Sequence, residues 1–204
     1  MPRIQAPTVA EHRAQQRRAI LDAARAHLAE EGQAPSLAQV GARANLARSS
    51  VYEYFGSRDE LLAGVVGDVF PDWAAQVIGS TESASTPGEQ VWAYVEANMQ
   101  LFASSEQAVA RALTSVVDPA LLAGPLNRFH ESLQKPLVAA LRAHGEAQPQ
   151  LMADIIGSML VRASHDVWSP NRRTAQRRLR TALRLLADLL WPYLGIDRGE
   201  PQPG

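Results

Sequence analysis

The chain has 204 residues, 46 % of them hydrophobic, and a formal net charge of −1 from 20 basic and 21 acidic side chains. It contains no cysteine, which excludes disulfides, cysteine-ligated zinc and thiol chemistry. No uncharged apolar run of about 18 residues occurs, and the first ten residues lack the apolar segment of a secretory signal. We therefore expect no membrane span and a cytoplasmic protein.

Helical periodicity dominates the chain, and alternating apolar runs typical of strands are scarce. The sequence therefore predicts an all-α protein of about nine helices. Residues 1–10 are expected to form a disordered arm, followed by a helix over residues 11–31 that ends at Gly32. A second helix is expected to open at Ser36 as its N-cap, and a third to span residues 48–55.

The fourth predicted helix is capped by Ser57 and carries a long apolar stripe that ends at Trp73. The Ser- and Thr-rich segment Gly79–Gly88 is expected to be a loop. Five more helices follow, of which one carries Trp92 and Phe102, and the others span about residues 106–117, 125–144, 149–168 and 172–194.

Residues 36–55 have the size of a helix-turn-helix, in which two short helices are joined by a tight turn. Such a motif places its second helix in the major groove of DNA, where arginine can read guanine and hydroxyls can reach phosphates or base edges. Val51 and Phe55, four residues apart, are expected to face the protein core. The polar residues that the second helix offers to DNA are Arg48, Ser49, Ser50, Tyr52 and Tyr54.

Several short segments between residues 20 and 62 keep a characteristic order and spacing: Ala23-Ala24, Gly32, Val40-Gly41, Ala44-Asn45-Leu46, Tyr52-Glu53-Tyr54-Phe55 and Ser57-Arg58-Asp59-Glu60-Leu61. Together they resemble the N-terminal domain of the TetR family of transcriptional regulators, over about a quarter of the chain. Asn45 replaces the family's usual turn glycine, and Ala47 replaces a common capping serine.

The resemblance implies a DNA-binding domain over residues 11–73, with its helix-turn-helix at about 36–55. It also implies a C-terminal effector-binding and dimerisation domain over residues 74–195, before a flexible tail at 196–204. The residues that it places on DNA are Ser36, Arg48, Ser49, Ser50, Tyr52, Tyr54 and Arg58.

The C-terminal region contains aromatic, methionine and polar side chains suited to a small-molecule pocket. The same pattern also fits an ordinary helical core, and that alternative stays open. The mixture favours an apolar or aromatic effector. The candidate ligand-binding residues are Trp73, Trp92, Asn98, Met99, Phe102, Leu113, Phe129, His130, Leu133 and Met159.

The last two predicted helices carry apolar residues on more than one face, which favours an interface with a second subunit. A wide core within a single subunit is the alternative. The arginine-rich run from Arg172 to Arg184 is either a solvated helix face or a second surface for nucleic acid or for an acidic partner. The candidate dimer residues are Ile155, Met159, Leu160, Ala163, Leu183, Leu186 and Leu190.

The resemblance thus implies a ligand-responsive transcriptional regulator, most simply a repressor. It would bind a palindromic double-stranded operator as a homodimer and be released by a small-molecule effector. The alternative is a helical small-molecule-binding protein whose DNA-reading helix no longer functions. An enzyme is not expected, because the five histidines are scattered and no phosphate-binding loop or nucleophile elbow occurs. We expect no cofactor and no metal site.

Overall fold

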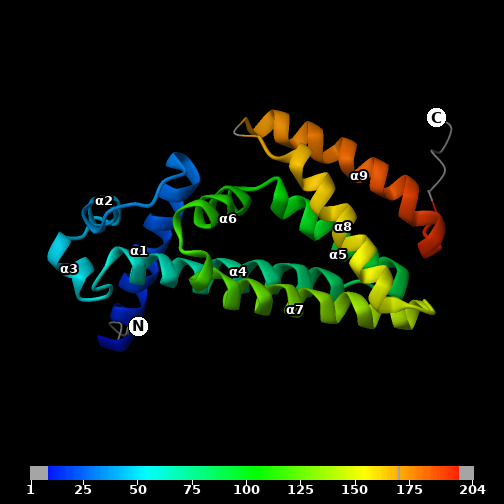
Figure 1. The fold of residues 1–204 in the computed structure, drawn as a ribbon, viewed down its shortest axis with the longest axis horizontal. Coiled ribbons are helices and arrows are strands. Elements are labelled where there is room, and N and C mark those ends of the chain that lie inside the picture. Colours follow the sequence, from blue (N-terminus) through cyan, green and yellow to red (C-terminus); the bar gives the residue numbers. More distant parts are fainter. Residues whose placement is uncertain (1–8, 170, 198–204) are drawn as a thin grey trace, which may run out of the picture. The chain divides into compact units, whose positions relative to one another are not determined.

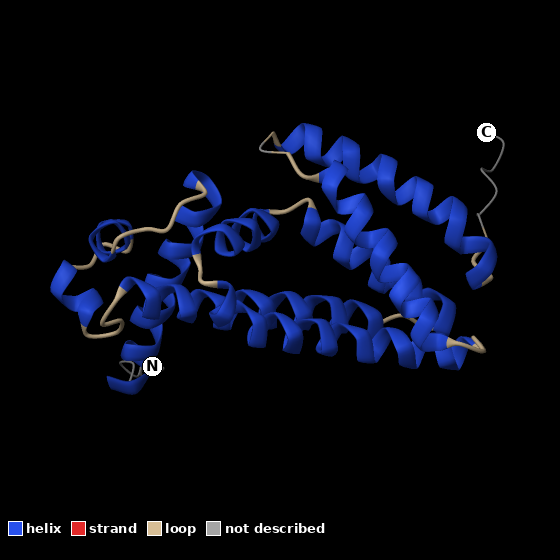
Figure 2. Cartoon of the chain, in the orientation of Figure 1, coloured by secondary structure: helices blue, strands red, loops and turns tan. Residues whose placement is uncertain are grey.

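The computed structural model describes residues 9–169 and 171–197, and all regular structure within these ranges is helical (Figures 1 and 2). The prediction of an all-α protein with nine helices is confirmed for this part of the chain. In chain order the helices are α1 (Val9–Glu31), α2 (Leu37–Arg43), α3 (Arg48–Tyr52), α4 (Arg58–Glu82), α5 (Pro87–Phe102), α6 (Ser105–Val116), α7 (Pro119–His144), α8 (Pro149–Val167) and α9 (Arg172–Leu194).

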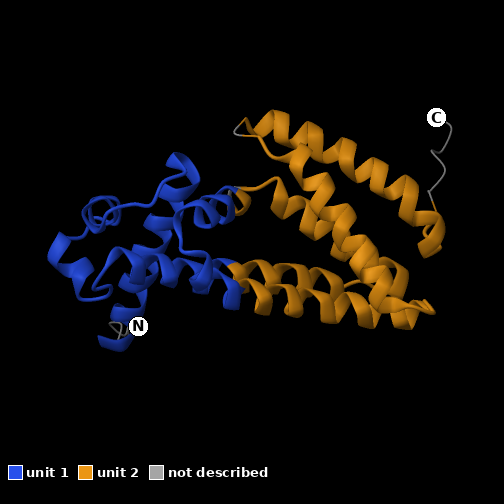
Figure 3. Cartoon of the chain, in the orientation of Figure 1, with its two compact units in different colours: residues 1–69, 108–125 blue, residues 70–107, 126–204 orange. Residues whose placement is uncertain are grey.

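The helices form two compact units (Figure 3). Unit 1 contains the described residues up to Val69 together with Ala108–Pro125, and unit 2 contains Phe70–Gln107 and the described residues from Leu126 onward. Helix α4 contributes residues to both units. The functional division after residue 73 stays a prediction, because compactness alone does not say which residues bind DNA or effector.

Helices α2 and α3 have the cap and the turn that their sequence predicts. Ser36 caps α2: its Oγ accepts from the backbone N–H of Gln39 at 3.2 Å, and Gln39 Oε1 accepts from the backbone N–H of Ser36 at 2.9 Å. Asn45 turns the chain between the helices at φ 55°, a left-handed conformation that asparagine tolerates better than most residues. Ala47 precedes α3 without a side-chain cap, as expected.

Three predicted boundaries are wrong near the N-terminal half of the chain. Val9 and Ala10 belong to α1 rather than to the arm, whose remaining residues lie outside the described part. Helix α3 ends at Tyr52, so the third helix is shorter than residues 48–55. Helix α4 continues to Glu82 and leaves only residues 83–86 as a loop, because Thr81 is buried and its hydroxyl donates to the carbonyl of Val77 at 2.8 Å.

The start of α7 is also corrected. The sequence predicts that Pro125 occupies the first helical position, but the helix begins at Pro119. The carboxylate of Asp118 accepts from the backbone N–H of Ala120 at 2.8 Å and so caps the earlier turn. Proline suits the first turn of a helix, and Pro125 lies within α7, where it removes one backbone hydrogen bond.

Unit 2 is built around α5, which packs against α8 and α9 while those two helices also pack against each other. Thr86 and Glu89 form a capping box at the start of α5. Gly88 lies so close to the end of α9 that a Cβ there would overlap the carbonyl oxygen of Leu194. Gly195, at φ 65°, ends α9, and the predicted tail beyond residue 197 lies outside the described part.

Among the described helices, α4 alone is long and apolar enough to cross a membrane by length and composition. Half of its most apolar stretch is buried inside the protein. The buried residues of this stripe include Leu61, Val65, Val69 and Trp73.

Candidate nucleic-acid interface and effector region

Helix α3 is held by a small apolar base beneath it. Val40, Val51 and Phe55 are buried, as the spacing of Val51 and Phe55 predicts for these two residues. A Cβ on Gly41 would lie 3.0 Å from the carbonyl oxygen of Leu46 and 3.1 Å from Cγ2 of Val51. Glycine at position 41 therefore permits the close approach of α2 to α3, and the opposite side of α3 stays in solvent.

The exposed side of α3 presents Arg48 and Tyr52 as a pair. Tyr52 is 44 % exposed. One guanidinium nitrogen of Arg48 donates to the Tyr52 hydroxyl at 3.1 Å, and Cζ of Arg48 lies 5.4 Å from the ring centroid. The hydrogen bond with Tyr52 raises the pKa of Arg48. The side chains lie four residues apart on one helix face, so a cation and a phenol point outward together.

The other residues predicted to contact DNA differ in their exposure to solvent and in the hydrogen bonds that their polar groups already make. Ser49 and Arg58 are exposed, and Ser50 is half-buried. The Ser36 hydroxyl already interacts with Gln39 within the cap, at 2.8 Å from its side-chain oxygen. The DNA contacts of these residues stay predictions.

Tyr54, just past α3, is tied to α1. Its hydroxyl donates to Gln16 Oε1 at 2.6 Å, and Cζ of Arg13 lies 5.6 Å from its ring centroid. Arg17 lies over the ring of Phe55 at 5.4 Å. Sequence reasoning did not include Arg13, Gln16 or Arg17 in the site, although their spacing places them on one face of a helix.

Unit 2 brings several predicted ligand-binding residues into one aromatic cluster. The ring centroids of Trp73 and Phe102 are 5.2 Å apart, those of Trp73 and Phe129 are 5.8 Å apart, and Phe70 lies 5.1 Å from Phe129. Phe102 and Phe129 are half-buried, whereas Trp73 and Phe70 are buried. The cluster therefore has a partly accessible apolar edge.

A single buried amide borders this cluster. Asn98 accepts from the indole N–H of Trp73 at 3.4 Å and donates to the carbonyl of Tyr94 at 2.8 Å. Burial raises the pKa of Tyr94 to about 12. His130 is exposed and its ring lies 5.7 Å from that of Phe129.

The remaining ligand candidates lie elsewhere or are simply buried. Trp92 meets Trp191 edge to face, with centroids 5.5 Å apart. Leu113 is buried in unit 1, whereas the aromatic cluster belongs to unit 2. Met159 lines a groove between α8 and α9. Met99 and Leu133 are buried in unit 2. The role of each in ligand binding stays a prediction.

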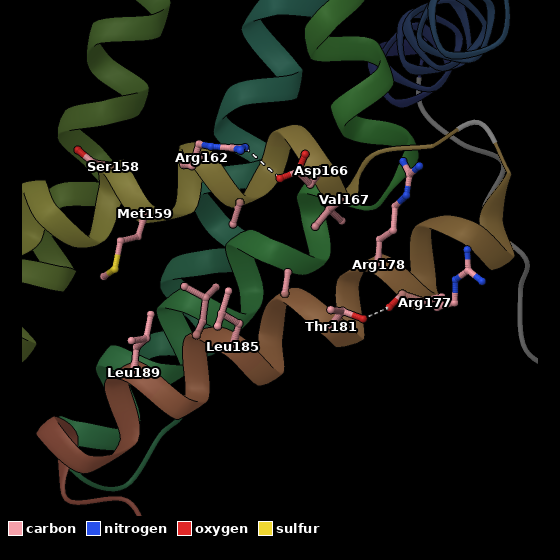
Figure 4. Close-up of a pocket in the computed structure, with 13 residues that line it drawn as sticks. Ser158, Met159, Arg162, Asp166, Val167, Arg177, Arg178, Thr181, Leu185 and Leu189 are labelled. Carbon is pink, nitrogen blue, oxygen red and sulfur yellow. Dashed lines mark hydrogen bonds and ion pairs between the residues drawn. The ribbon is translucent and has the colours of Figure 1, made fainter.

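The groove between α8 and α9 has a volume of about 720 Å³ (Figure 4). Leu185 and Leu189, which are 62 % and 58 % exposed, belong to its apolar lining on α9. On the α8 side, Arg162 and Asp166 form an ion pair at 2.9 Å. The lining residues are Ser158, Met159, Arg162, Ala163, Asp166, Val167, Arg177, Arg178, Thr181, Ala182, Leu185, Leu186 and Leu189.

The structure divides the predicted dimer residues into inner and outer sets. Leu160, Leu186 and Leu190 are only 4–6 % exposed, so their side chains pack within the chain's own core. Ile155 is exposed, Leu183 is half-buried, and Met159 and Ala163 line the groove. The predicted set omits Leu185 and Leu189, whose i, i+4 spacing on α9 marks a second apolar stripe. The interface itself stays a prediction.

Comparison with known proteins places the N-terminal region in a family. Residues 20–65 match the family model of bacterial regulatory proteins, tetR family. The sequence has no significant match among curated proteins.

Solved structures with the same fold cover most of the chain. A TetR-family transcriptional regulator from Pectobacterium atrosepticum shares 25 % identity and a TM-score of 0.65, over 91 % of this chain and 97 % of that one. The SmeT–triclosan complex has 20 % identity and a TM-score of 0.63, over 93 % and 99 %. AibR, solved with isovaleryl coenzyme A and operator DNA, has 16 % identity and a TM-score of 0.62, over 83 % and 97 %. Residues 20–65 of this chain thus match the tetR family of bacterial regulatory proteins, and its all-helical fold is similar to that of solved TetR-family transcriptional regulators.

Proposed function

We propose that this protein is a cytoplasmic, ligand-responsive transcriptional repressor. In this proposal it binds a near-palindromic operator as a homodimer and dissociates when a small-molecule effector binds. The observation that carries the proposal is the outward-facing Arg48–Tyr52 pair on a short helix whose opposite side is fixed by Gly41, Val51 and Phe55.

The Arg48–Tyr52 pair on α3 carries the chemical groups that recognise DNA bases and phosphates. Arginine can donate two parallel hydrogen bonds to guanine in the major groove, and a tyrosine hydroxyl can reach a phosphate or a base edge. Because the two side chains already contact each other, part of the ordering cost of binding is removed in advance. AibR, which was solved with operator DNA, shares the fold of this chain.

The α8–α9 surface supports a homodimer. Exposed apolar side chains on these two helices include Leu151, Ile155, Leu185 and Leu189. Several exposed apolar side chains on two packed helices are typical of an interaction surface, and a second copy of the same helices would bury them through a two-fold axis. A dimer also carries two α3 helices, which matches the two half-sites of a palindromic operator.

The aromatic cluster of unit 2 supports binding of an apolar or aromatic effector. Its edge contains Phe102 and Phe129, and Asn98 offers one amide for orientation. SmeT was solved with triclosan, and that precedent fits a ligand with an aromatic ring.

Helix α4 supplies a physical route for effector control. Arg58, a proposed phosphate contact, opens the helix in unit 1, and Trp73 of the aromatic cluster lies on the same helix in unit 2. A ligand that displaces Trp73 therefore also biases the position of Arg58. Allosteric coupling between two sites is typically worth about 1–3 kcal/mol.

The test is selection of binding sites from a random double-stranded library, followed by fluorescence-anisotropy titration of the enriched duplex. We expect a near-palindromic sequence that binds the wild type far more tightly than a scrambled duplex does. The Arg48→Ala, Tyr52→Ala double variant should lose this preference, whereas Arg180→Ala, an exposed arginine on α9, should keep it. Absence of any enriched sequence, with intact helical content, would favour a ligand-binding protein that no longer reads DNA.

A further inference from the structure

The arginines of unit 1 differ in whether a carboxylate neutralises them. Arg18 forms ion pairs with Asp22 at 3.3 Å and with Asp68 at 3.9 Å. Arg43 holds Glu30 through both of its terminal nitrogens, one of them at 2.7 Å. Carboxylates of the protein itself therefore already balance both of these positive charges.

Arg13 and Arg17, in the N-terminal half of α1, have a different environment. Both are exposed, and neither forms an ion pair with a carboxylate within residues 9–169 and 171–197. Each guanidinium instead lies over an aromatic ring: Arg13 over Tyr54 at 5.6 Å and Arg17 over Phe55 at 5.4 Å. Tyr54 and Phe55 lie two and three residues beyond the end of α3 in the sequence.

The α1–α3 junction is fixed by more than these two contacts. Gln16 accepts a hydrogen bond from the Tyr54 hydroxyl at 2.6 Å, and Phe55 is only 3 % exposed. Residues 13, 16 and 17 lie on one face of α1. The two arginines are therefore held at a defined place beside the end of α3 rather than scattered over a solvated surface.

A guanidinium that lies over an aromatic ring keeps its hydrogen-bonding capacity. The ring faces attract the positive charge, and the five N–H donors of each group stay available to another acceptor. The fork of these donors matches the oxygens of a phosphate. Two such groups beside α3 form a positively charged edge that has no carboxylate ion-pair partner in the part of the chain that the structure describes.

We propose that Arg13 and Arg17 of α1 bind the operator's phosphate backbone next to the groove that α3 reads. The proposal rests on the function proposed above and adds a second contact element to it. Arg13 and Arg17 anchor the duplex without regard to sequence, whereas Arg48 and Tyr52 select the sequence.

The experiment is the salt dependence of anisotropy-measured binding to the selected duplex and to a scrambled duplex of the same length. Each phosphate contact adds about 0.9 to the slope of log K against log salt concentration. A dimer carries two copies of each arginine, so Arg13→Gln, Arg17→Gln should reduce the slope by about 3.6 on both duplexes. The ratio of affinities for the two duplexes should stay as in the wild type.

Two further variants separate charge from packing. Arg18→Gln, which removes an arginine already paired with Asp22, should leave the slope unchanged. Arg13→Lys, Arg17→Lys keeps the charges and should retain most of the wild-type slope, although the planar ring contacts are lost. If the lysine variant loses as much slope as the glutamine variant, the arginines act through packing and the proposal is overturned.

The outcomes also distinguish this proposal from the function on which it rests. A wild-type protein that binds its selected duplex specifically, together with an unchanged slope in a folded Arg13→Gln, Arg17→Gln variant, refutes the α1 phosphate contact alone. If the double glutamine variant loses helical content, the single variants Arg13→Gln and Arg17→Gln take its place: each should reduce the slope by about 1.8, and an unchanged slope in both refutes the α1 phosphate contact. A wild type without sequence preference refutes the proposed function instead.

Discussion

Substitutions on the α8–α9 face test the proposed dimer most directly. Leu185 and Leu189 lie one helical turn apart on α9 and are 62 % and 58 % exposed. In a two-fold dimer, glutamates at these positions place four carboxylates in the interface. We therefore predict that Leu185→Glu, Leu189→Glu converts the protein to a monomer.

The exposed fractions set the size of the effect. Leu151, Ile155, Leu185 and Leu189 together expose about as much as two whole side chains per subunit. Full burial of such a side chain contributes about 1.5–3 kcal/mol, so two subunits gain about 6–12 kcal/mol before association costs of about 4–15 kcal/mol. Loss of the two leucines in each subunit removes more than half of that gain, which is at least about 3 kcal/mol. This loss raises the Kd of the dimer by more than about a hundredfold.

Sedimentation equilibrium at micromolar concentration measures this change directly. The matched control is Leu121→Glu on α7, because Leu121 is 55 % exposed and lies outside the α8–α9 face. The control should remain dimeric with an unaltered circular dichroism spectrum. A wild type that is monomeric at these concentrations, or a double variant that stays dimeric, would refute the assignment of this face.

Two other predictions concern contacts inside unit 2. Gly88→Ala should destabilise the protein by about 1–3 kcal/mol in urea unfolding, because the new Cβ collides with the Leu194 carbonyl. The control is Gly79→Ala on α4, where the new Cβ meets open space, so this change should be neutral or stabilising. Equal effects of the two substitutions on the free energy of unfolding would contradict the close contact at Gly88. The hydrogen bond from the Tyr193 hydroxyl lowers the pKa of Glu146 below 4.5, so the stabilisation from this pair is present above about pH 4.5 and is lost as pH falls through the lowered pKa. The difference in free energy of unfolding between the Tyr193→Phe variant and the wild type should therefore shrink as the pH is lowered. The corresponding difference for Tyr52→Phe should not change with pH. A Tyr193→Phe difference that stays constant down to pH 3 would disprove the contribution of the Glu146–Tyr193 hydrogen bond.

Local rules predicted the helix-turn-helix well, because its geometry depends on neighbouring residues. Ser36 caps its own helix with Gln39, Asn45 adopts the left-handed turn, and Ala47 leaves α3 uncapped. The spacing of Val51 and Phe55 was sufficient to identify the buried side.

Long helices were harder to delimit because tertiary burial overrides composition. Thr81 belongs to a segment that looks like a loop, yet it is buried in α4 with its hydroxyl bonded to the preceding turn. Pro125 looks like a helix start, but the Asp118 cap begins α7 earlier. A proline alone does not identify which of several turns is the first.

The candidate sites show the same limit. Periodicity identified apolar residues on α8 and α9 but could not separate inward Leu160, Leu186 and Leu190 from outward Leu185 and Leu189. The contact between Arg13 and Tyr54 joins residues 41 positions apart, for which the sequence carries no local signal.

The central claim is that two α3 helices of a dimer read one operator. Hydroxyl-radical footprinting on the duplex selected by the wild type tests it most directly. We predict two protected half-sites related by approximate two-fold symmetry, with centres about one helical turn, or 10 base pairs, apart, and loss of both in Arg48→Ala, Tyr52→Ala. A single unsymmetric footprint, or protection that survives in the double variant, would contradict the account.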